Sequence, residues 1–212
     1  MISRSVPLYQ EVGHTSVALA AKFAQANSNI YDLGCSTGTT LIALSEVIQD
    51  TSVKLVGLDS SEAMISEFRN RLVSDSHKDI RISCEDILTN QYIDASVIIG
   101  NYTLQFLPVS TRASLSKKIA DSLKPGGLFI LSEKIKHPHD KLHRILTELH
   151  HDFKRANGYS DLEIAQKRDS IENVLVPITI EENIQMLKES GFDIVYPVLT
   201  WYTFVTLAAI KL

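Results

Sequence analysis

Short apolar runs alternate along most of the chain with segments of helical periodicity. The apolar runs lie at residues 30–33, 53–59, 80–86, 96–107 and 128–134. In the segments that follow, apolar residues recur every three or four positions, which predicts helices over residues 39–48, 61–72 and 110–123. Strands that alternate with helices favour a parallel sheet wound with right-handed crossovers, in which ligands bind beyond the carboxyl ends of the strands.

Polar residues predict where several of these elements begin. Ser60 or Ser61 is placed to cap the second helix and Ser110 the third, because a serine hydroxyl accepts the backbone N–H groups that a helix start leaves unpaired. The sequence KPGG, which ends at residue 127, predicts a turn before the fifth strand.

Residues 137–178 interrupt the alternation with an amphipathic, histidine-rich helix and further polar sequence, and we interpret them as an insertion. The alternation resumes with a capping box that starts at Thr179, and Gly191 predicts a helix stop. Two final strands are expected before residue 212, and the Tyr196–Pro197 step fits an edge or a bulge. We therefore expect one domain over residues 1–212.

Composition narrows the class of protein. The chain has 212 residues, of which 44% are hydrophobic and 22% charged, as is typical of one soluble α/β domain. No apolar run approaches the ~18 residues of a membrane span, and the first ten residues lack the core of a signal peptide. The two cysteines lack a CxxC spacing, and a net charge of −4 disfavours direct nucleic-acid binding. We expect a cytoplasmic protein without membrane or nucleic-acid contacts.

The loop at residues 32–38, DLGCSTG, carries the candidate chemistry. It joins the first strand to a helix start, where exposed backbone N–H groups can hold a ligand. Asp59, which ends the second strand about 20 residues beyond Gly38, is placed to bind ribose hydroxyls. Ser36 occupies a position where a pyrophosphate site needs glycine, so a cofactor without pyrophosphate fits better. Asp86 and Asn101 end the third and fourth strands, and Asp86 is placed to bind adenine.

This set of strand-end residues resembles the Rossmann-like class I S-adenosylmethionine-dependent methyltransferase fold. The resemblance implies a mostly parallel seven-stranded sheet whose last strand is antiparallel, here with a helical insertion. Several longer motifs resemble a narrower family, the carboxy-S-adenosyl-L-methionine synthases, and they run collinearly from about Ser3 to the C-terminus. The motifs are RSVPLY (4–9), YDLGCS (31–36), NYTLQFL (101–107), LSEK (131–134), residues 150–168 and ENVL (172–175).

The resemblance implies a reaction of S-adenosyl-L-methionine with prephenate, which gives carboxy-S-adenosyl-L-methionine and phenylpyruvate. In that family the product then serves a partner enzyme that modifies wobble uridine in tRNA, and the synthase is a homodimer. The insertion is the expected place for the dimer contact. The ligand contacts that the resemblance implies fall on Tyr9, Gly34, Cys35, Ser36, Asp59, Ser60, Asp86, Ile87 and Asn101.

Arg168 is the catalytic residue that the resemblance implies. A sulfonium repels a guanidinium unless the ligand also carries an anion, whereas a carboxylate can accept both arms of the arginine fork. We expect Arg168 to hold carboxylates by position and charge rather than to move protons. From spacing alone, a surface arginine at a helix end is the simpler interpretation.

Two other functions are compatible with the same residues: a conventional small-molecule methyltransferase and a noncatalytic S-adenosylmethionine-binding homologue. The chain also departs from the family pattern. The family carries an N-terminal arm before RSVPLY that helps to cover the ligand. In this chain Ser60 replaces asparagine, and Val205-Thr206 replaces Gly-Ser. His139 and His143 have a metal-binding spacing, but no acidic or cysteine ligands complete the set, so we predict no metal.

Overall fold

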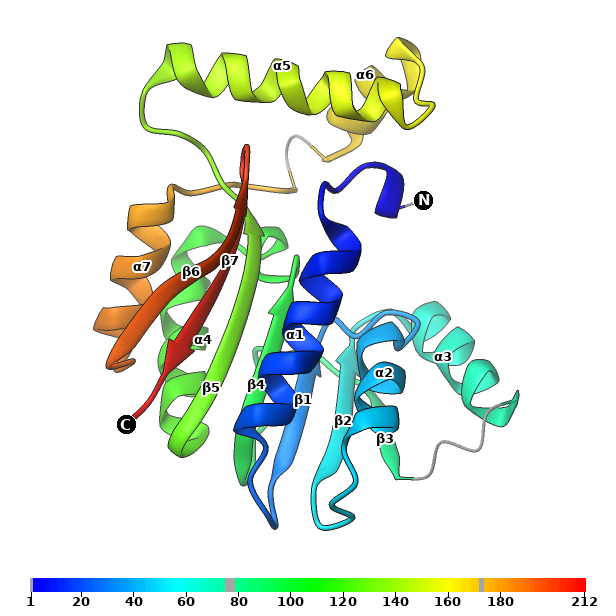
Figure 1. Cartoon of the computed structure of the whole chain (residues 1–212), viewed down its shortest axis with the longest axis vertical. Coiled ribbons are helices and arrows are strands. Elements are labelled where there is room, and N and C mark those ends of the chain that lie inside the picture. The colour runs from blue at the N-terminus through cyan, green and yellow to red at the C-terminus, as the bar shows by residue number, and fades with distance from the viewer. Residues whose placement is uncertain (1, 75–78, 172–173) are drawn as a thin grey trace.

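The computed structural model describes residues 2–74, 79–171 and 174–212, and within them the chain forms a seven-stranded sheet (Figure 1). The strand order is β3-β2-β1-β4-β5-β7-β6, and β7 is antiparallel to both of its neighbours. This arrangement confirms the predicted fold class. The strands are β1 (Asn29–Leu33), β2 (Lys54–Asp59), β3 (Ile80–Cys84), β4 (Ala95–Asn101), β5 (Leu123–Lys134), β6 (Ile194–Trp201) and β7 (Phe204–Ile210).

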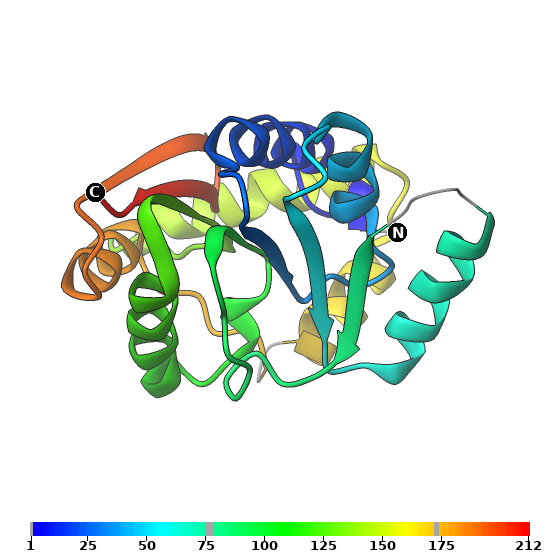
Figure 2. The same cartoon turned by 90° about the horizontal axis from the view of Figure 1, so that it is seen from below.

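Helices cover both faces of the sheet, as the end-on view in Figure 2 shows. Alternate strand residues face opposite layers: Val97 and Ile99 of β4 pack with α1, α2 and α3, whereas Ile98 packs with α4 and α7. Each face therefore has its own apolar core, and the central strands are buried on both sides. These helices are α1 (Tyr9–Phe23), α2 (Thr39–Val47), α3 (Glu62–Ser74), α4 (Val109–Ser122) and α7 (Ile180–Glu189).

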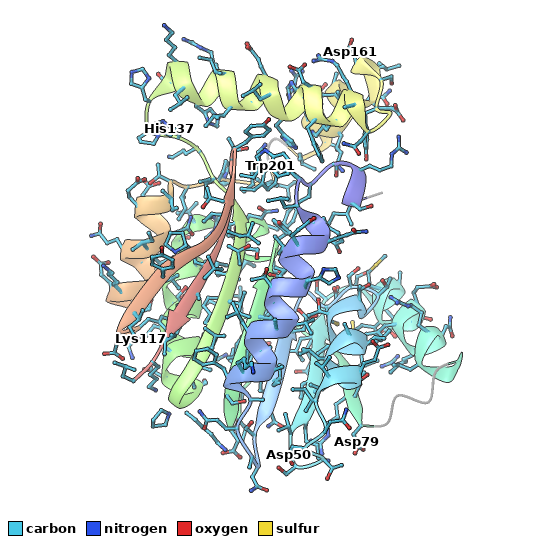
Figure 3. The ribbon with its side chains drawn as sticks, viewed as in Figure 1. Asp50, Asp79, Lys117, His137, Asp161 and Trp201 are labelled. Atoms are coloured by element: carbon cyan, nitrogen blue, oxygen red, sulfur yellow. The ribbon has the colours of Figure 1, made fainter. Side chains whose placement is uncertain are left out.

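Two further helices, α5 (Asp140–Ala156) and α6 (Asp161–Ile171), lie across the carboxyl end of the sheet (Figure 1). Figure 3 shows Trp201 just below α5, where its ring centroid is 5.8 Å from that of Phe153. The N-terminal segment holds this layer from the other side, because the Arg4 guanidinium donates to the backbone oxygens of Asn157 and Gly158 at 2.7 Å. RSVPLY and residues 150–168, far apart in the chain, thus meet.

Several predicted boundaries are confirmed. The Ser61 hydroxyl accepts the Met64 N–H at 3.4 Å, and Thr179 and Glu182 form a reciprocal capping box at the start of α7. Pro197 lies on the edge strand β6, where the register with β7 shifts between Pro197 and Leu199. An edge position tolerates proline because a missing N–H costs little there.

Two predicted features are wrong in detail. Helix α4 begins at Val109 after Pro108, with no side-chain cap, so Ser110 lies inside the helix. The KPGG segment belongs to β5, where the register with β4 shifts from the Ala95–Leu123 pair to the Val97–Leu128 pair. Gly126, with φ of 75°, adopts a left-handed conformation in this irregular part of the strand.

Helix α1 has no counterpart among the predicted elements. Its buried positions are Val12, Ser16 and Ala20, which share one face, but two of the three are small and carry little hydrophobic signal. None of the helices in the described part of the chain combines the length and apolar character that a membrane crossing needs. Glu172 and Asn173 of the ENVL motif lie outside the described residues.

Candidate functional site

The loop after β1 has a backbone that glycine makes possible. Gly34 and Gly38 have φ angles of 70° and 80°, and Ser36 between them has φ of 50°. The Gly34 and Cys35 N–H groups donate to the Leu58 oxygen at 2.8 and 3.0 Å, which ties the loop to β2. A Cβ at Gly34 would lie 2.7 Å from the Thr103 hydroxyl, so this turn admits no side chain without displacement.

Asp59 joins this loop to the start of α3. One carboxylate oxygen accepts the Ser36 N–H and the other accepts the Ser61 N–H, both at 2.9 Å. The exposed Ser60 lies between these two anchors in the chain. The structure therefore brings Gly34, Cys35, Ser36, Asp59 and Ser60 together at the carboxyl ends of β1 and β2, where the sequence analysis placed them.

Asp32 is the most unusual group in the site. Its side chain is 4% exposed, and within the described residues it makes no hydrogen bond. Burial, together with the nearby charge of Asp59, raises the pKa of Asp32 from 3.8 to about 7. A buried carboxylate without a partner is stabilised by a cation. The sulfonium and ammonium groups of S-adenosylmethionine are such cations, so this buried carboxylate fits that ligand.

The third strand end is held by its own turn. The Asp86 carboxylate accepts the Leu88 N–H at 2.8 Å, and the buried Tyr92 hydroxyl donates to the Ile87 oxygen at 2.6 Å. The Glu85 backbone N–H donates to the backbone oxygen of Asp59 at 3.0 Å, so the turn at Asp86 and Ile87 is fixed directly beside the end of β2.

Asn101, at the end of β4, is held by serines that the sequence analysis did not single out. Its side-chain oxygen accepts the Ser132 hydroxyl at 2.6 Å, and its side-chain amide donates to Ser16 at 3.2 Å. Ser132 also lies 3.0 Å from the Thr206 hydroxyl, and both are buried. The Thr206 that departs from the family pattern thus supports the network beneath Asn101. Ser132 and Ser16 come from β5 and α1, and only the folded chain shows this convergence.

Tyr9 begins α1 and lies over this end of the sheet. Its ring stacks on Tyr102 with a centroid distance of 6.5 Å, and Tyr102 in turn meets Phe204 edge-on at 6.3 Å. Burial and the charge of Asp32 raise the pKa of Tyr9, so the phenol lies within the electrostatic reach of the loop acid. Tyr9 is therefore positioned beside the site, as the RSVPLY motif implied.

The structure does not bring Arg168 to these residues within one chain. Arg168 lies on α6 with an exposed side chain, and its guanidinium donates to the neighbouring Asp169 carboxylate at 3.0 and 3.1 Å. Burial and several neighbouring cations, Arg168 among them, lower the pKa of His151 on α5, so Arg168 lies in the electrostatic reach of that helix. Arg168 therefore belongs to the layer above the sheet and not to the loop cluster.

Two other candidate chemistries find little support. Burial raises the pKa of the Cys35 thiol, and Asp32 and Asp59 raise it further, so Cys35 is not an activated nucleophile. The Nδ1 atoms of His137 and His143 accept backbone N–H groups at 3.0 and 3.2 Å. Across the residues that the structure describes, no group of three or more His, Cys, Asp or Glu side chains is placed to hold a metal.

Comparison with known proteins extends these observations. A family model described as "Methyltransferase domain" matches residues 30–127. The chain is 47% identical over 211 residues to a "Carboxy-S-adenosyl-L-methionine synthase" of Sulfurimonas denitrificans, a match that covers 100% of this chain and 89% of that protein. A protein of the same name from Marinobacter nauticus is 44% identical over 215 residues, covering 100% and 85%.

Solved structures show the same fold at low sequence identity. Human N-acetylserotonin methyltransferase in complex with S-adenosylmethionine has a TM-score of 0.65 at 15% identity, covering 96% of this chain and 52% of that one. An S-adenosylmethionine-dependent methyltransferase from Aquifex aeolicus has a TM-score of 0.63 at 15% identity, covering 98% and 95%. At this identity the likeness establishes the fold and nothing finer.

Proposed function

We propose that this chain, which belongs to the carboxy-S-adenosyl-L-methionine synthase family as its motifs predicted, converts S-adenosyl-L-methionine and prephenate into carboxy-S-adenosyl-L-methionine and phenylpyruvate. The observation that carries the proposal is the buried Asp32 carboxylate in the β1 loop, which has no partner in the described chain. It supports a cationic ligand at the β1 loop, and one solved protein of the same fold is a complex with S-adenosylmethionine.

We propose that different residues of the cluster bind different parts of S-adenosylmethionine. Gly34, Cys35 and Ser36 would hold the amino-acid portion, and Asp59 with Ser60 the ribose hydroxyls. The turn at Asp86 and Ile87 would hold the adenine, Asn101 would lie near the sulfonium, and Tyr9 would close over the site. The positions of these residues at adjacent strand ends support the division.

The bound S-adenosylmethionine supplies an activated methyl group on a positive sulfur. Prephenate loses carbon dioxide and hydroxide as its ring becomes aromatic. The hydroxide can take the proton that the methyl group gives up, and the methyl carbon then bonds to the carbon dioxide, so the protein need not supply a base. The residues of this chain must hold the two reactants together and keep water away. We propose that Arg168 binds carboxylates and that α5 and α6, as an insertion in a single domain, cover the site.

We also propose a homodimer whose contact includes α5. The apolar stripe of this helix is only partly buried within one chain, because Leu142, Ile145 and Leu149 are 40%, 43% and 39% exposed. Such a stripe favours burial against a second copy. Arg168 lies in the same layer, so a dimer through α5 would also change what surrounds its guanidinium.

Replacing Ile145 with Glu should convert the dimer into a monomer, because the contact would have to bury an unpaired charge. Size-exclusion chromatography with light scattering measures the change in mass. Arg144→Glu alters the neighbouring, exposed position of the same helix and should leave the mass unchanged. An Ile145→Glu protein that keeps a dimer mass would rule out this face.

The net charge of −4 disfavours binding of a polynucleotide, so we propose that the product passes as a small molecule to a separate tRNA uridine carboxymethyltransferase. Both cysteines in the described chain are free. This is consistent with a reducing compartment, and we place the reaction in the cytoplasm.

Mass spectrometry of the nucleoside bound to purified protein, before and after incubation with prephenate, tests the function. The expected product is a sulfonium heavier by one carboxyl group, together with phenylpyruvate. S-adenosylhomocysteine and a methylated acceptor would instead indicate a conventional methyltransferase. Unchanged S-adenosylmethionine on folded protein would indicate a noncatalytic binder.

The raised pKa of Asp32 makes ligand affinity depend on pH. A bound cation favours the ionised carboxylate, so binding should release a proton when the pH is near or below 7, and affinity should fall by up to about tenfold per pH unit below that value. Calorimetric titration of S-adenosylmethionine into the protein from pH 5.5 to 8.5 measures both the affinity and the proton release. Asp32→Asn should bind more weakly with a flat profile, whereas Glu189→Gln, a distant exposed acid, should behave as wild type.

The raised pKa of Asp32 also makes the stability of the free protein depend on pH. This stability falls as the pH rises, whereas the affinity for the ligand increases. Because the pKa of Asp32 rises from 3.8 to about 7 on folding, the contribution of Asp32 to stability is fully present below pH 3.8 and is lost as the pH rises through 7. Asp32→Asn should therefore unfold at a higher temperature than wild type at pH 8 without ligand. A lower melting temperature would show that the carboxylate has a partner in the free protein.

A further inference from the structure

Three lysines from separate elements converge beneath the α5 and α6 layer. Lys134 ends β5, Lys154 lies on α5 and Lys167 on α6. Lys154 is 8% exposed. Burial and, after it, the charge of Lys134 lower the pKa of both His150 and Lys154, so Lys134 lies near enough to α5 to act on these two groups. The sheet and both helices of the layer thus contribute one cation each.

Specific contacts hold this cluster in place. In the β5–β7 ladder Lys134 lies opposite Phe204, whose ring meets His150 edge-on at 4.9 Å. The His150 Nε2 lies 2.8 Å from the backbone oxygen of Ser5, and the Lys167 ammonium donates to the Ser5 hydroxyl at 2.9 Å. His150 is one helical turn from Lys154 on the same face of α5. The buried Ser5 therefore links α5 to α6 at this point.

The cluster lacks a counter-ion in the described chain. Lys134, Lys154 and Lys167 form no ion pair with any described residue. Burial lowers the pKa of Lys134, and burial with the charges of Lys134 and Lys167 lowers the pKa of Lys154 to about 8. Buried like charges destabilise a fold unless an anion compensates them. An anion bound among these lysines would supply that compensation.

The cluster is connected to the ligand loop by aromatic contacts. Phe204 meets Tyr102, and Tyr102 stacks on Tyr9, whose pKa is raised by burial and by the charge of Asp32. Figure 1 shows α5 and α6 over the carboxyl end of the sheet, the same end as the loop. The lysines therefore lie at the same end of the sheet as the proposed reactive site.

We propose that Lys134, Lys154 and Lys167 bind the carboxylate that prephenate retains throughout the reaction. This rests on the proposed function, in which prephenate carries two carboxylates. One leaves the ring as carbon dioxide and ends on the methyl group, so it belongs near the sulfonium. The other remains on the pyruvyl side chain and is still present in phenylpyruvate. A site for the retained group orients the ring and binds substrate and product alike.

The test replaces Lys154 with Met, which keeps the length of the side chain and removes the charge. Prephenate and phenylpyruvate are each titrated calorimetrically into the full-length protein, and KM is measured separately for prephenate and for S-adenosylmethionine. We expect Lys154→Met to weaken binding of both acids, and to raise the KM for prephenate, by about ten- to a hundredfold. The affinity for S-adenosylmethionine should stay within about twofold of wild type.

Lys141→Met is the matched control, because Lys141 is exposed on the same helix and should leave every value unchanged. Without ligand, Lys154→Met should melt at or above the wild-type temperature, since a buried charge has been removed; a paired structural lysine would lower it. Lys167→Met provides a second, independent variant from α6 with the same expected pattern.

The outcomes separate the inference from the proposed function. Wild-type turnover with unchanged prephenate binding in Lys154→Met and Lys167→Met would overturn the lysine site and leave the function intact. Weaker binding of both acids in the variants, without carboxylated product from wild type, would support the site and refute the function. Variants that bind prephenate normally but no longer dimerise would show that the lysines serve the subunit contact instead.

Discussion

Arg168→Ala should abolish carboxylated product while the protein still binds S-adenosylmethionine with nearly its wild-type affinity. The expected loss in kcat/KM exceeds about a hundredfold, the scale on which removal of one preorganised charge acts. We expect product formation to be lost without loss of ligand binding, because the Arg168 guanidinium lies on α6, apart from the loop that holds the ligand. The measurements are product formation by mass spectrometry and ligand affinity by calorimetry.

The chemistry explains why a lysine should not replace this arginine. A guanidinium binds a carboxylate through two parallel hydrogen bonds, which fixes the plane of the group, whereas an ammonium binds it as a point charge. Arg168→Lys should therefore recover only a small part of the activity. Arg144→Ala removes another exposed arginine from the same layer and should have no effect on turnover. Parallel loss of turnover and ligand binding in Arg168→Ala would contradict the assigned role.

Mixing two inactive variants shows which subunit Arg168 serves. Arg168→Ala keeps the ligand loop, and Asp59→Ala keeps the arginine but loses the carboxylate that holds the loop together. If Arg168 acts in the neighbouring site of a dimer, mixed dimers contain one intact site and regain activity. If it acts in its own subunit, the mixture stays inactive. The exposed Arg168 side chain in the single chain makes the first result the expected one.

The sequence predicted the parts of this site that follow from strand periodicity. Asp32, Asp59, Asp86 and Asn101 each end an apolar run, and parallel strands bring such ends to one edge of a sheet. The order of apolar runs and polar residues along the chain is therefore enough to predict that these groups converge. Their individual partners could be anticipated less well, because the Asp59 contact to Ser36 depends on the exact backbone of the loop.

Other features depend on contacts between distant segments and left no local signal. The support of Asn101 comes from Ser16 and Ser132, two small residues in segments with no distinguishing motif. The lysine cluster arises only because an α5–α6 layer is folded back over β5, and a lysine in an amphipathic helix ordinarily indicates a solvated face. Arg168 was singled out by resemblance alone, and its spacing would have favoured a surface role.

Gly38→Ala should destabilise the protein by at least about 3 kcal/mol and eliminate S-adenosylmethionine binding. Gly38 has φ of 80°, where an L side chain costs roughly 1–2 kcal/mol. A Cβ there would lie 2.0 Å from the ring of Phe68, which is fully buried. Urea unfolding measures the stability. Gly13→Ala is the matched control, because nothing lies within 4 Å of that Cβ and a helical alanine should stabilise α1 by about 1 kcal/mol.

The double variant Gly38→Ala with Phe68→Leu separates the two causes of that loss. Leucine removes the far ring atoms that overlap the new Cβ, so the double variant should be more stable than the sum of the single effects predicts. The backbone cost at a φ of 80° remains, so recovery should be partial. Additive effects would mean that the Phe68 ring can move away from the new Cβ. The positive φ alone would then explain why position 38 requires glycine. Coupling would mean that this glycine is required because α3 packs its phenylalanine against the ligand loop, so that core packing and ligand binding share one residue.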